Sequence, residues 1–221
     1  MIVVVSDLHI GDNRVDGNLS SLFGTIERLA APDSHLVLNG DTFDLAVLPC
    51  FDSRHREFIS VARKHGRITY IKGNHDWLVD GLDDALAPNT LFCHEFEETL
   101  GGRRFRFLHG HQSDFISNRL PRLNRIMIRA NHWIADTLGI DLQMRLRATG
   151  IGQRTLERQE NRIAENSPGA HVVVAGHTHR PGIRLVGGRM YVNTGDWMER
   201  RHCSYLLIRN DGTFELTTLE G

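Results

Sequence analysis

The sequence alternates short β-branched apolar runs with segments of helical periodicity, and this alternation constrains the fold more than any other feature. The first runs are IVVVS (2–6), HLVLN (35–39) and ITYIK (68–72), separated by helical patterns around 19–30 and 54–64. A strand–helix–strand–helix–strand order needs crossover connections, which produce a parallel sheet with helices on its faces. We therefore expect an α/β fold in the first half of the chain.

Later apolar runs continue the pattern and make the C-terminal third rich in strands. The turn signals VGGR and RNDGT separate the last of these runs. An α/β first half followed by a strand-rich end predicts a single domain over residues 1–221, with two mixed sheets packed together and flanked by helices. The further strands are expected at 104–109, 171–176, 190–195, 204–208 and 213–219.

Residues 115–168 interrupt this alternation, because the stretch has no strand pattern and predicts helices. Pro121 suits the first turn of a helix, and Gly139 suits its end. Between them we expect one apolar face, with arginines on roughly the opposite face. The stretch is thus interpreted as a helical insertion, and its apolar face contains Leu123, Met127, Ala130, Ile134 and Leu138.

The composition limits the class of protein. Forty per cent of the residues are hydrophobic, 24% are charged and the formal net charge is −1, which indicates a globular protein and argues against nucleic acid as a partner. The three cysteines are far apart and fit a reducing cytosol better than a disulfide framework. No secretory signal or membrane span is visible, so we expect a cytoplasmic location that leaves room for peripheral membrane contact.

Polar side chains able to bind metal follow five of the apolar runs. Because the carboxyl ends of strands in open α/β sheets meet at one rim, these side chains are expected to lie together. Glycines adjoin them and permit sharp turns. The side chains are Asp7 and His9 after the first run, Asp41, then Asn74, His75 and Asp76, then His109 and His111, and finally His177 and His179.

The chemistry of this set indicates divalent metal ions. Imidazoles, carboxylates and an amide without any thiolate suit Mn, Fe, Co, Ni or Zn. The set is too large for one tetrahedral site but fits two ions of higher coordination. Two such ions can hold a bridging hydroxide and clamp a phosphoryl oxygen, as in phosphatases and nucleases. A shared carboxylate would hold the pair together, and Asp41 is the natural candidate.

Each motif alone has an ordinary structural interpretation. A strand-end Asp such as Asp7 often caps the next helix, and the Gly40–Asp41 dipeptide is a common turn. A lone His109 is more often a hydrogen-bonding residue than a ligand. It is the occurrence of all the motifs in one order and at domain-like spacings that favours a metal centre.

Together the motifs D-x-H, G-D, G-N-H-D, a later strand-end His and G-H-x-H resemble those of the calcineurin-like metallophosphoesterase superfamily, and the match runs from Asp7 to His179. The resemblance implies a β-sandwich flanked by helices, a dinuclear metal centre with manganese as the first choice, and hydrolysis of a phosphoester or pyrophosphate bond by a metal-bridging hydroxide. It also implies roles for individual residues. Asp7, His9 and His179 would bind one metal, Asn74, His109 and His177 the other, Asp41 both, and His75, oriented by Asp76, would act as proton donor near the leaving group.

Further features are similar to those of UDP-2,3-diacylglucosamine pyrophosphatases (hydrolases), a branch of the superfamily that cleaves a lipid-linked pyrophosphate. They are the helical insertion after HGH and the segments SDLHIGD, NGDTFD and YVNTGDWME. This resemblance implies that the insertion helps to bind the acylated sugar, with its apolar face as a wall for the acyl chains. Arg119, Arg122 or Arg125 would then lie near phosphates, and His111 would serve as a substrate-facing residue or support a ligand. The alternative is an ordinary amphipathic helix, whose apolar face packs on the core while its arginines face water.

Two positions depart from that branch, whose members often carry Arg in place of His75 and Asp in place of His111. Two other functions therefore stay open: a general phosphodiesterase, phosphatase or nuclease of the same superfamily, and a non-catalytic scaffold. The complete set of ligands argues against the scaffold. Asp44 in NGDTFD also has two interpretations, since it could hold a ligand or the turn, or simply face solvent.

Overall fold

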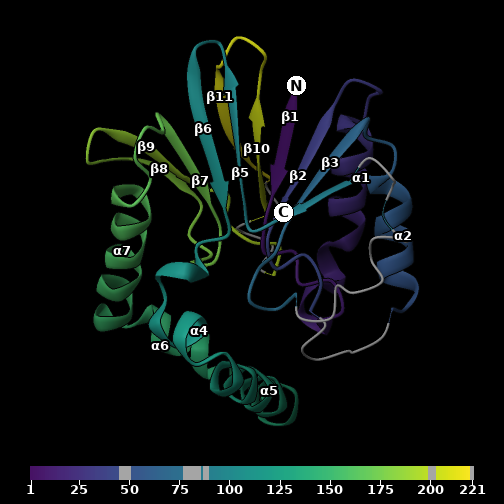
Figure 1. Cartoon of the computed structure of the whole chain (residues 1–221). Coiled ribbons are helices and arrows are strands. Elements are labelled where there is room, and N and C mark those ends of the chain that lie inside the picture. Colours follow the sequence, from purple (N-terminus) through teal and green to yellow (C-terminus); the bar gives the residue numbers. More distant parts are fainter. Residues whose placement is uncertain (45–50, 77–85, 87–89, 199–202, 220–221) are drawn as a thin grey trace.

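Two β-sheets packed against each other form the centre of the protein in this computed structural model (Figure 1). The structure describes residues 1–44, 51–76, 86, 90–198 and 203–219. One sheet has six strands in the order β11-β10-β1-β2-β3-β4, and the other has five in the order β5-β6-β7-β9-β8.

The six-stranded sheet has a parallel part, which ends at the candidate metal site. Its strands β1 to β4 run parallel to one another, and β10 and β11 extend the sheet antiparallel beyond β1. The crossovers between the first strands are the helices predicted by the sequence. The strands are β1 (Ile2–Val5), β2 (His35–Asn39), β3 (Arg67–Ile71), β4 (Thr90–Cys93), β10 (Ser204–Ile208) and β11 (Phe214–Thr218).

The five-stranded sheet is also mixed. Strands β6, β7 and β9 run parallel, while the edge strands β5 and β8 pair antiparallel with β6 and β9. The bounds are β5 (Glu95–Leu100), β6 (Arg103–Leu108), β7 (Val172–Ala175), β8 (Gly182–Val186) and β9 (Arg189–Asn193).

The apolar strands bury both faces, because successive side chains point to opposite sides of a sheet. In β1, Val4 packs against Phe105 and Phe107 of the second sheet, whereas Val3 and Val5 belong to the core under the helices α1 and α2. A third cluster packs the outer face of the second sheet against α7. The layers are therefore helices, sheet, sheet and helix, which confirms the predicted α/β sandwich of two mixed sheets flanked by helices.

The helices fall into two groups. Helices α1 (Leu19–Leu29) and α2 (Ser53–Ala62) cover the first sheet, and the 3-10 helix η1 (Asn13–Asn18) precedes α1. The helical segment, defined here as residues 115–165, follows β6 and extends below the sheets in Figure 1. It begins after the 3-10 turn η2 (His111–Ser113) and consists of α4 (Phe115–Arg119), α5 (Pro121–Leu138), α6 (Leu142–Ala148) and α7 (Gly150–Glu165).

Helix α5 has the predicted ends but turns its apolar face outward. Pro121 opens the helix and Gly139 closes it in the left-handed conformation. Leu123 and Met127, which belong to the predicted apolar face, are 46% and 49% exposed. The buried side of α5 instead carries Ile128 and His132, which are 5% and 6% exposed. The interpretation in which the apolar face packs on the core is therefore wrong.

The sequence analysis did not predict three of the strands, β4, β5 and β8. Each lies at a sheet edge, and β5 and β8 are half-exposed with alternating burial. An edge strand lacks the continuous apolar run by which the central strands were recognised. Among the described helices, none combines the length and apolar character that crossing a membrane requires.

We predict that Phe107→Ala lowers the free energy of unfolding by about 3–5 kcal/mol, because Phe107 is fully buried between the sheets and its removal leaves a cavity. Leu185→Ala is the control, since Leu185 in β8 is 71% exposed and should change stability by less than about 0.5 kcal/mol. Urea unfolding measures both variants. Equal losses would contradict the placement of Phe107 in the central core.

Candidate metal centre

The loops after β1, β2, β3, β6 and β7 bring the predicted ligands together at one rim of the sandwich. Four groups of potential ligands each have their ligand atoms within 4.8 Å of one another. They are Asp7 with His9 and His179, His9 with Asp41 and His75, Asp41 with His109 and His177, and Asp44 with His75 and His132. Asp41 thus belongs to two groups. The rim is the expected one, because β1, β2 and β3 run parallel and end side by side.

The backbone at these positions is unusual. Among the described residues other than glycine, a positive φ occurs at only five positions. Such left-handed geometry costs about 1–2 kcal/mol per residue and clusters at functional sites. Backbone hydrogen bonds hold it in place, from Asp7 N to Gly40 O and from His9 N to Asp41 O, both 3.0 Å. The five residues are Asp7, His9, Asp41, His177 and His179, all of them predicted ligands.

Glycines permit the loops to pack directly on ligand side chains. A Cβ atom added to Gly73 would lie 2.1 Å from Asp41 Oδ1, and one added to Gly176 would lie 2.3 Å from Asp7 Oδ2. Both distances are far below van der Waals contact. Gly73 and Gly176 are therefore required, because a residue with a side chain would overlap these carboxylates.

Asp7 and His179 form the first side of the centre. His179 Nε2 lies 3.2 Å from Asp7 Oδ1, and His179 Nδ1 donates to Asp196 Oδ2 at 2.9 Å. This second bond fixes the ring and leaves Nε2 for a metal ion, the arrangement common in metal-binding histidines. Asp7 is fully buried and accepts a hydrogen bond from His177 N.

His9 supplies a direct test of whether a metal ion fits. Its Nδ1 donates to Asp44 Oδ2 at 3.3 Å, so its Nε2 is the nitrogen left to accept. That Nε2 is buried and has no hydrogen-bond partner among the described residues. A buried acceptor left without a partner is costly, and a divalent cation beside Asp7 and Asp41 would satisfy it.

Asp41, His109 and Asn74 form the second side. His109 Nδ1 donates to Asn39 O at 3.1 Å, which directs Nε2 toward Asp41 Oδ2 at 3.1 Å and Asn74 Oδ1 at 3.3 Å. Burial opposes the charged form of His109, but the Asp41 carboxylate outweighs burial and raises the His109 pKa to about 9. His109 Nε2 thus lies close to both oxygen atoms, as a shared cation would require.

Asp76 braces the backbone of the centre. Its carboxylate accepts hydrogen bonds from the backbone N–H groups of Asp41 and Gly73, both at 2.8 Å, and from the Tyr70 hydroxyl at 2.8 Å. Burial and the nearby Asp41 carboxylate raise the pKa of Asp76 to about 6. These hydrogen bonds fix the Asp41 loop. From the sequence we expected Asp76 to orient His75 instead.

Asp44 holds the His75 ring by a hydrogen bond. His75 Nδ1 donates to Asp44 Oδ2 at 3.2 Å, and Asp44 is fully buried. The solvent-facing interpretation of Asp44 is therefore wrong. Burial disfavours the charged His75 ring, but the carboxylates of Asp44 and Asp41 outweigh burial and raise the His75 pKa to about 9.

His111 lies beside the second side of the centre. Its ring centroid is 5.4 Å from that of His109 and 6.4 Å from that of His177. Burial, together with the charge of those two rings, lowers the His111 pKa to about 3. Its Nδ1 is buried without a hydrogen-bond partner among the described residues. His111 is thus a neutral imidazole with an unused nitrogen next to the ligands.

Arg147 contacts the candidate metal centre, although the sequence pointed to other arginines. Arg119, Arg122 and Arg125 are exposed on α4 and α5. Arg147 of α6 is half-buried and donates from Nη2 to His177 O at 3.3 Å. Burial lowers the Arg147 pKa, although Asp7 and Asp196 oppose this effect. Sequence reasoning missed Arg147 because one arginine among many on helical segments carries no motif.

The chain is similar to known proteins over most of its length. The model of the calcineurin-like phosphoesterase family matches residues 1–181. A UDP-2,3-diacylglucosamine hydrolase of Shewanella piezotolerans is 26% identical, with 94% of this chain and 93% of the relative covered. One of the same name from Pseudomonas putida is 27% identical, with 100% and 99% covered.

Solved structures share the fold. A phosphodiesterase from an archaeon is similar with a TM-score of 0.50 and 16% identity, and the match covers 99% of each chain. An Aquifex aeolicus protein of unknown function is similar with a TM-score of 0.51 and 16% identity, over 88% of this chain and 89% of that one. At these identities the likeness shows the sandwich fold alone.

We predict that Gly73→Ala displaces the Asp41 carboxylate and lowers metal content and activity at least about tenfold, because the added methyl group would overlap Asp41 Oδ1. Gly24→Ala is the matched control. A Cβ at Gly24, within α1, meets nothing within 4 Å, and alanine favours a helix. Metal analysis after dialysis measures both. Normal metal content in Gly73→Ala would contradict the packing of Gly73 on Asp41.

Proposed function

The chain belongs to the calcineurin-like phosphoesterase family, a family of hydrolases, and from this premise we propose that it cleaves its substrate with two divalent ions. The supporting observation is that Asp41 belongs to two groups of ligand atoms. Manganese is the proposed ion, with Fe, Co, Ni or Zn as alternatives, because the donors are nitrogen and oxygen atoms. Asp7, His9 and His179 would hold one ion, Asn74, His109 and His177 the other, and Asp41 both.

Two bound ions supply a lowered pKa for water and neutralise charge on phosphoryl oxygens. The residues of the chain supply the remaining functions. His75 is proposed as the proton donor to the leaving oxygen. Its Nδ1 is engaged with Asp44, so Nε2 is the nitrogen from which a proton can be donated. Imidazole is well suited to such a role near neutral pH.

Arg147 and His111 are proposed to contact the substrate. The Arg147 guanidinium lies beside His177 O, close to the ligands, and a guanidinium can bind two phosphate oxygens at once. His111 adds a neutral ring nitrogen without a partner among the described residues. The two side chains would hold the phosphate groups on either side of the bond that is cleaved.

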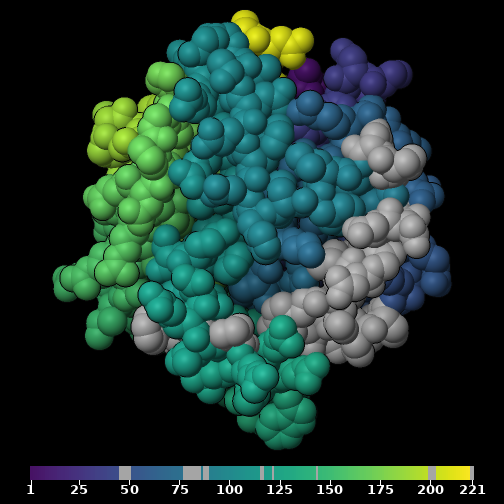
Figure 2. Space-filling view, in the orientation of Figure 1, coloured from purple at the N-terminus to yellow at the C-terminus, as the bar shows by residue number. Residues whose placement is uncertain are grey.

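We propose a UDP-2,3-diacylglucosamine-type lipid pyrophosphate as substrate. The name of the relatives supports this choice, and so does the surface of the helical segment, which lies at the lower end of Figure 2. Part of this surface is apolar although it is exposed, as a site for acyl chains would be, and Arg122, Arg125 and Arg129 are exposed on α5 as well. Its exposed side chains include Leu123, Ile126, Met127, Trp133, Leu138 and Leu142.

A substrate panel in the presence of Mn²⁺ tests the proposal. We expect kcat/KM for UDP-2,3-diacylglucosamine to exceed that for its non-acylated counterpart by at least about a hundredfold, because several buried methylene groups contribute about 0.8 kcal/mol each. Simple phosphodiesters, cyclic nucleotides and phosphomonoesters complete the panel. Preference for one of these would contradict the lipid substrate and favour a general phosphodiesterase or phosphatase.

Two variants separate metal binding from proton donation in the same assay. His75→Ala should keep both ions and lose about 10²–10⁴ in kcat, as expected for the loss of a general acid. His177→Ala should lose metal together with activity. Full activity in His75→Ala would exclude His75 as proton donor, and loss of metal in that variant would make it a ligand.

A further inference from the structure

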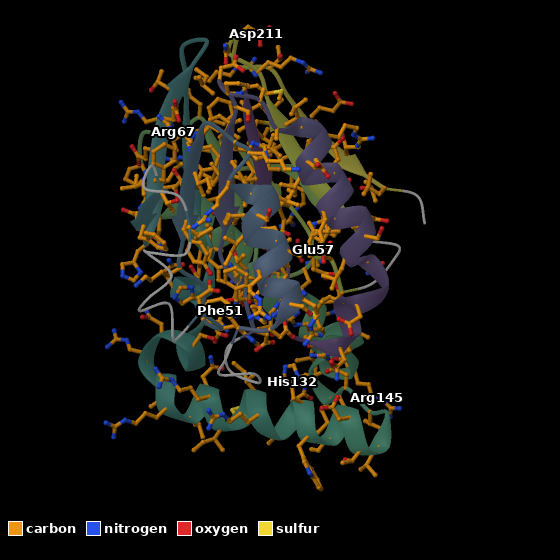
Figure 3. The ribbon with its side chains drawn as sticks, turned by 90° about the vertical axis from the view of Figure 1, so that its right-hand side faces the viewer. Phe51, Glu57, Arg67, His132, Arg145 and Asp211 are labelled. Atoms are coloured by element: carbon orange, nitrogen blue, oxygen red, sulfur yellow. The ribbon has the colours of Figure 1, made fainter. Side chains whose placement is uncertain are left out.

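One buried polar side chain connects helix α5 to the rim of the metal centre. His132 is 6% exposed, while Trp133 beside it is 66% exposed. Figure 3 shows His132 on the side of α5 that faces the body of the protein. Its Nε2 lies 3.4 Å from Asp44 Oδ2, so a residue of the helical segment contacts the carboxylate that holds His75.

The Asp44 carboxylate is surrounded by imidazoles from three parts of the chain. Its Oδ2 lies 3.3 Å from His9 Nδ1, 3.2 Å from His75 Nδ1 and 3.4 Å from His132 Nε2. Its Oδ1 is buried and has no hydrogen-bond partner among the described residues. The orientation of this carboxylate therefore depends on the three rings that meet at one oxygen.

Arg14 holds His132 from the other side. Arg14 Nη2 lies 3.5 Å from His132 Nδ1 and 3.3 Å from His132 Nε2, and Arg14 Nε donates to Asp12 Oδ2 at 2.8 Å. Arg14 Nη1 also pairs with Asp141, which caps the N-terminus of α6. A carboxylate can only accept, so a proton on His132 Nε2 would let the ring donate to Asp44 Oδ2, 3.4 Å away.

We propose that His132 is a positioning residue for the reaction. By donating to Asp44, it fixes the carboxylate that aligns the His75 ring, so the docking of the helical segment and the geometry of the proton donor are coupled. The inference rests on the proposed function, in which His75 protonates the leaving group. A merely structural His132 would stabilise the contact of α5 and leave His75 unaffected.

The first test is the kinetics of His132→Ala with 2′,3′-cyclic AMP, a small substrate that has no acyl chains and whose alkoxide leaving group needs a proton. We expect kcat to fall about 10- to 100-fold, the usual effect of removing a residue that orients a catalytic group, with KM unchanged and both ions retained. His132→Gln should restore most of the activity, because its side-chain amide can donate to Asp44. No rescue by Gln would contradict the donor role.

A double-mutant cycle supplies the decisive comparison. If His132 acts through His75, His132→Ala should cause no further loss in a protein that already carries His75→Ala. An independent role would give the same fold loss in both backgrounds and would overturn the inference. If His132→Ala does not fold, His132→Met, of similar volume but without a donor, replaces it in the cycle.

Controls separate this inference from the proposed function. Asp136→Ala, at an exposed position of the same helix, should leave activity, metal content and melting temperature unchanged. Wild-type protein without metal-dependent activity, or full activity in His75→Ala, would overturn both the proposed function and the inference. An impaired His75→Ala protein with a fully active His132→Ala protein would overturn the inference alone.

Discussion

Two carboxylates, those of Asp7 and Asp41, are buried at the ends of adjacent parallel strands, where water cannot screen their charge. Leaving such groups charged in the interior costs several kcal/mol each unless opposite charge lies close by. Imidazoles from three other loops surround them, and the backbone of Asp41 is held by Asp76. The need to compensate these two charges explains why the rim is lined with histidines, and it supports the proposal that cations bind there.

The same constraint accounts for the shape of the loops. The ligands after β1, β2 and β7 adopt left-handed backbone conformations that ordinary residues avoid. Glycines such as Gly73 make room for ligand side chains. The sandwich core tolerates this local strain because β1 and β2 are buried on both faces and their hydrogen bonds continue into the loops. Stability is thus provided by the sheets, while the site is built at their ends.

Patterns in the sequence were sufficient to predict the central strands and the residues at their ends, because both depend on local apolar runs followed by polar groups. The edge strands β4, β5 and β8 lack such runs and were missed. Asp44 was a candidate from its motif, but Asp196, Arg147 and His132 could not be predicted, because they reach the centre through tertiary contacts. Asp76 was recognised as a site residue, but its contacts with the Asp41 loop became visible only in the fold.

The central claim is that Asp41 joins two metal ions, and anomalous diffraction from crystals grown with Mn²⁺ tests it most directly. We expect two anomalous peaks per chain, about 3.5–4 Å apart as in other two-metal sites, with the Asp41 carboxylate in contact with both ions. A single peak, or two peaks of which only one contacts Asp41, would contradict it.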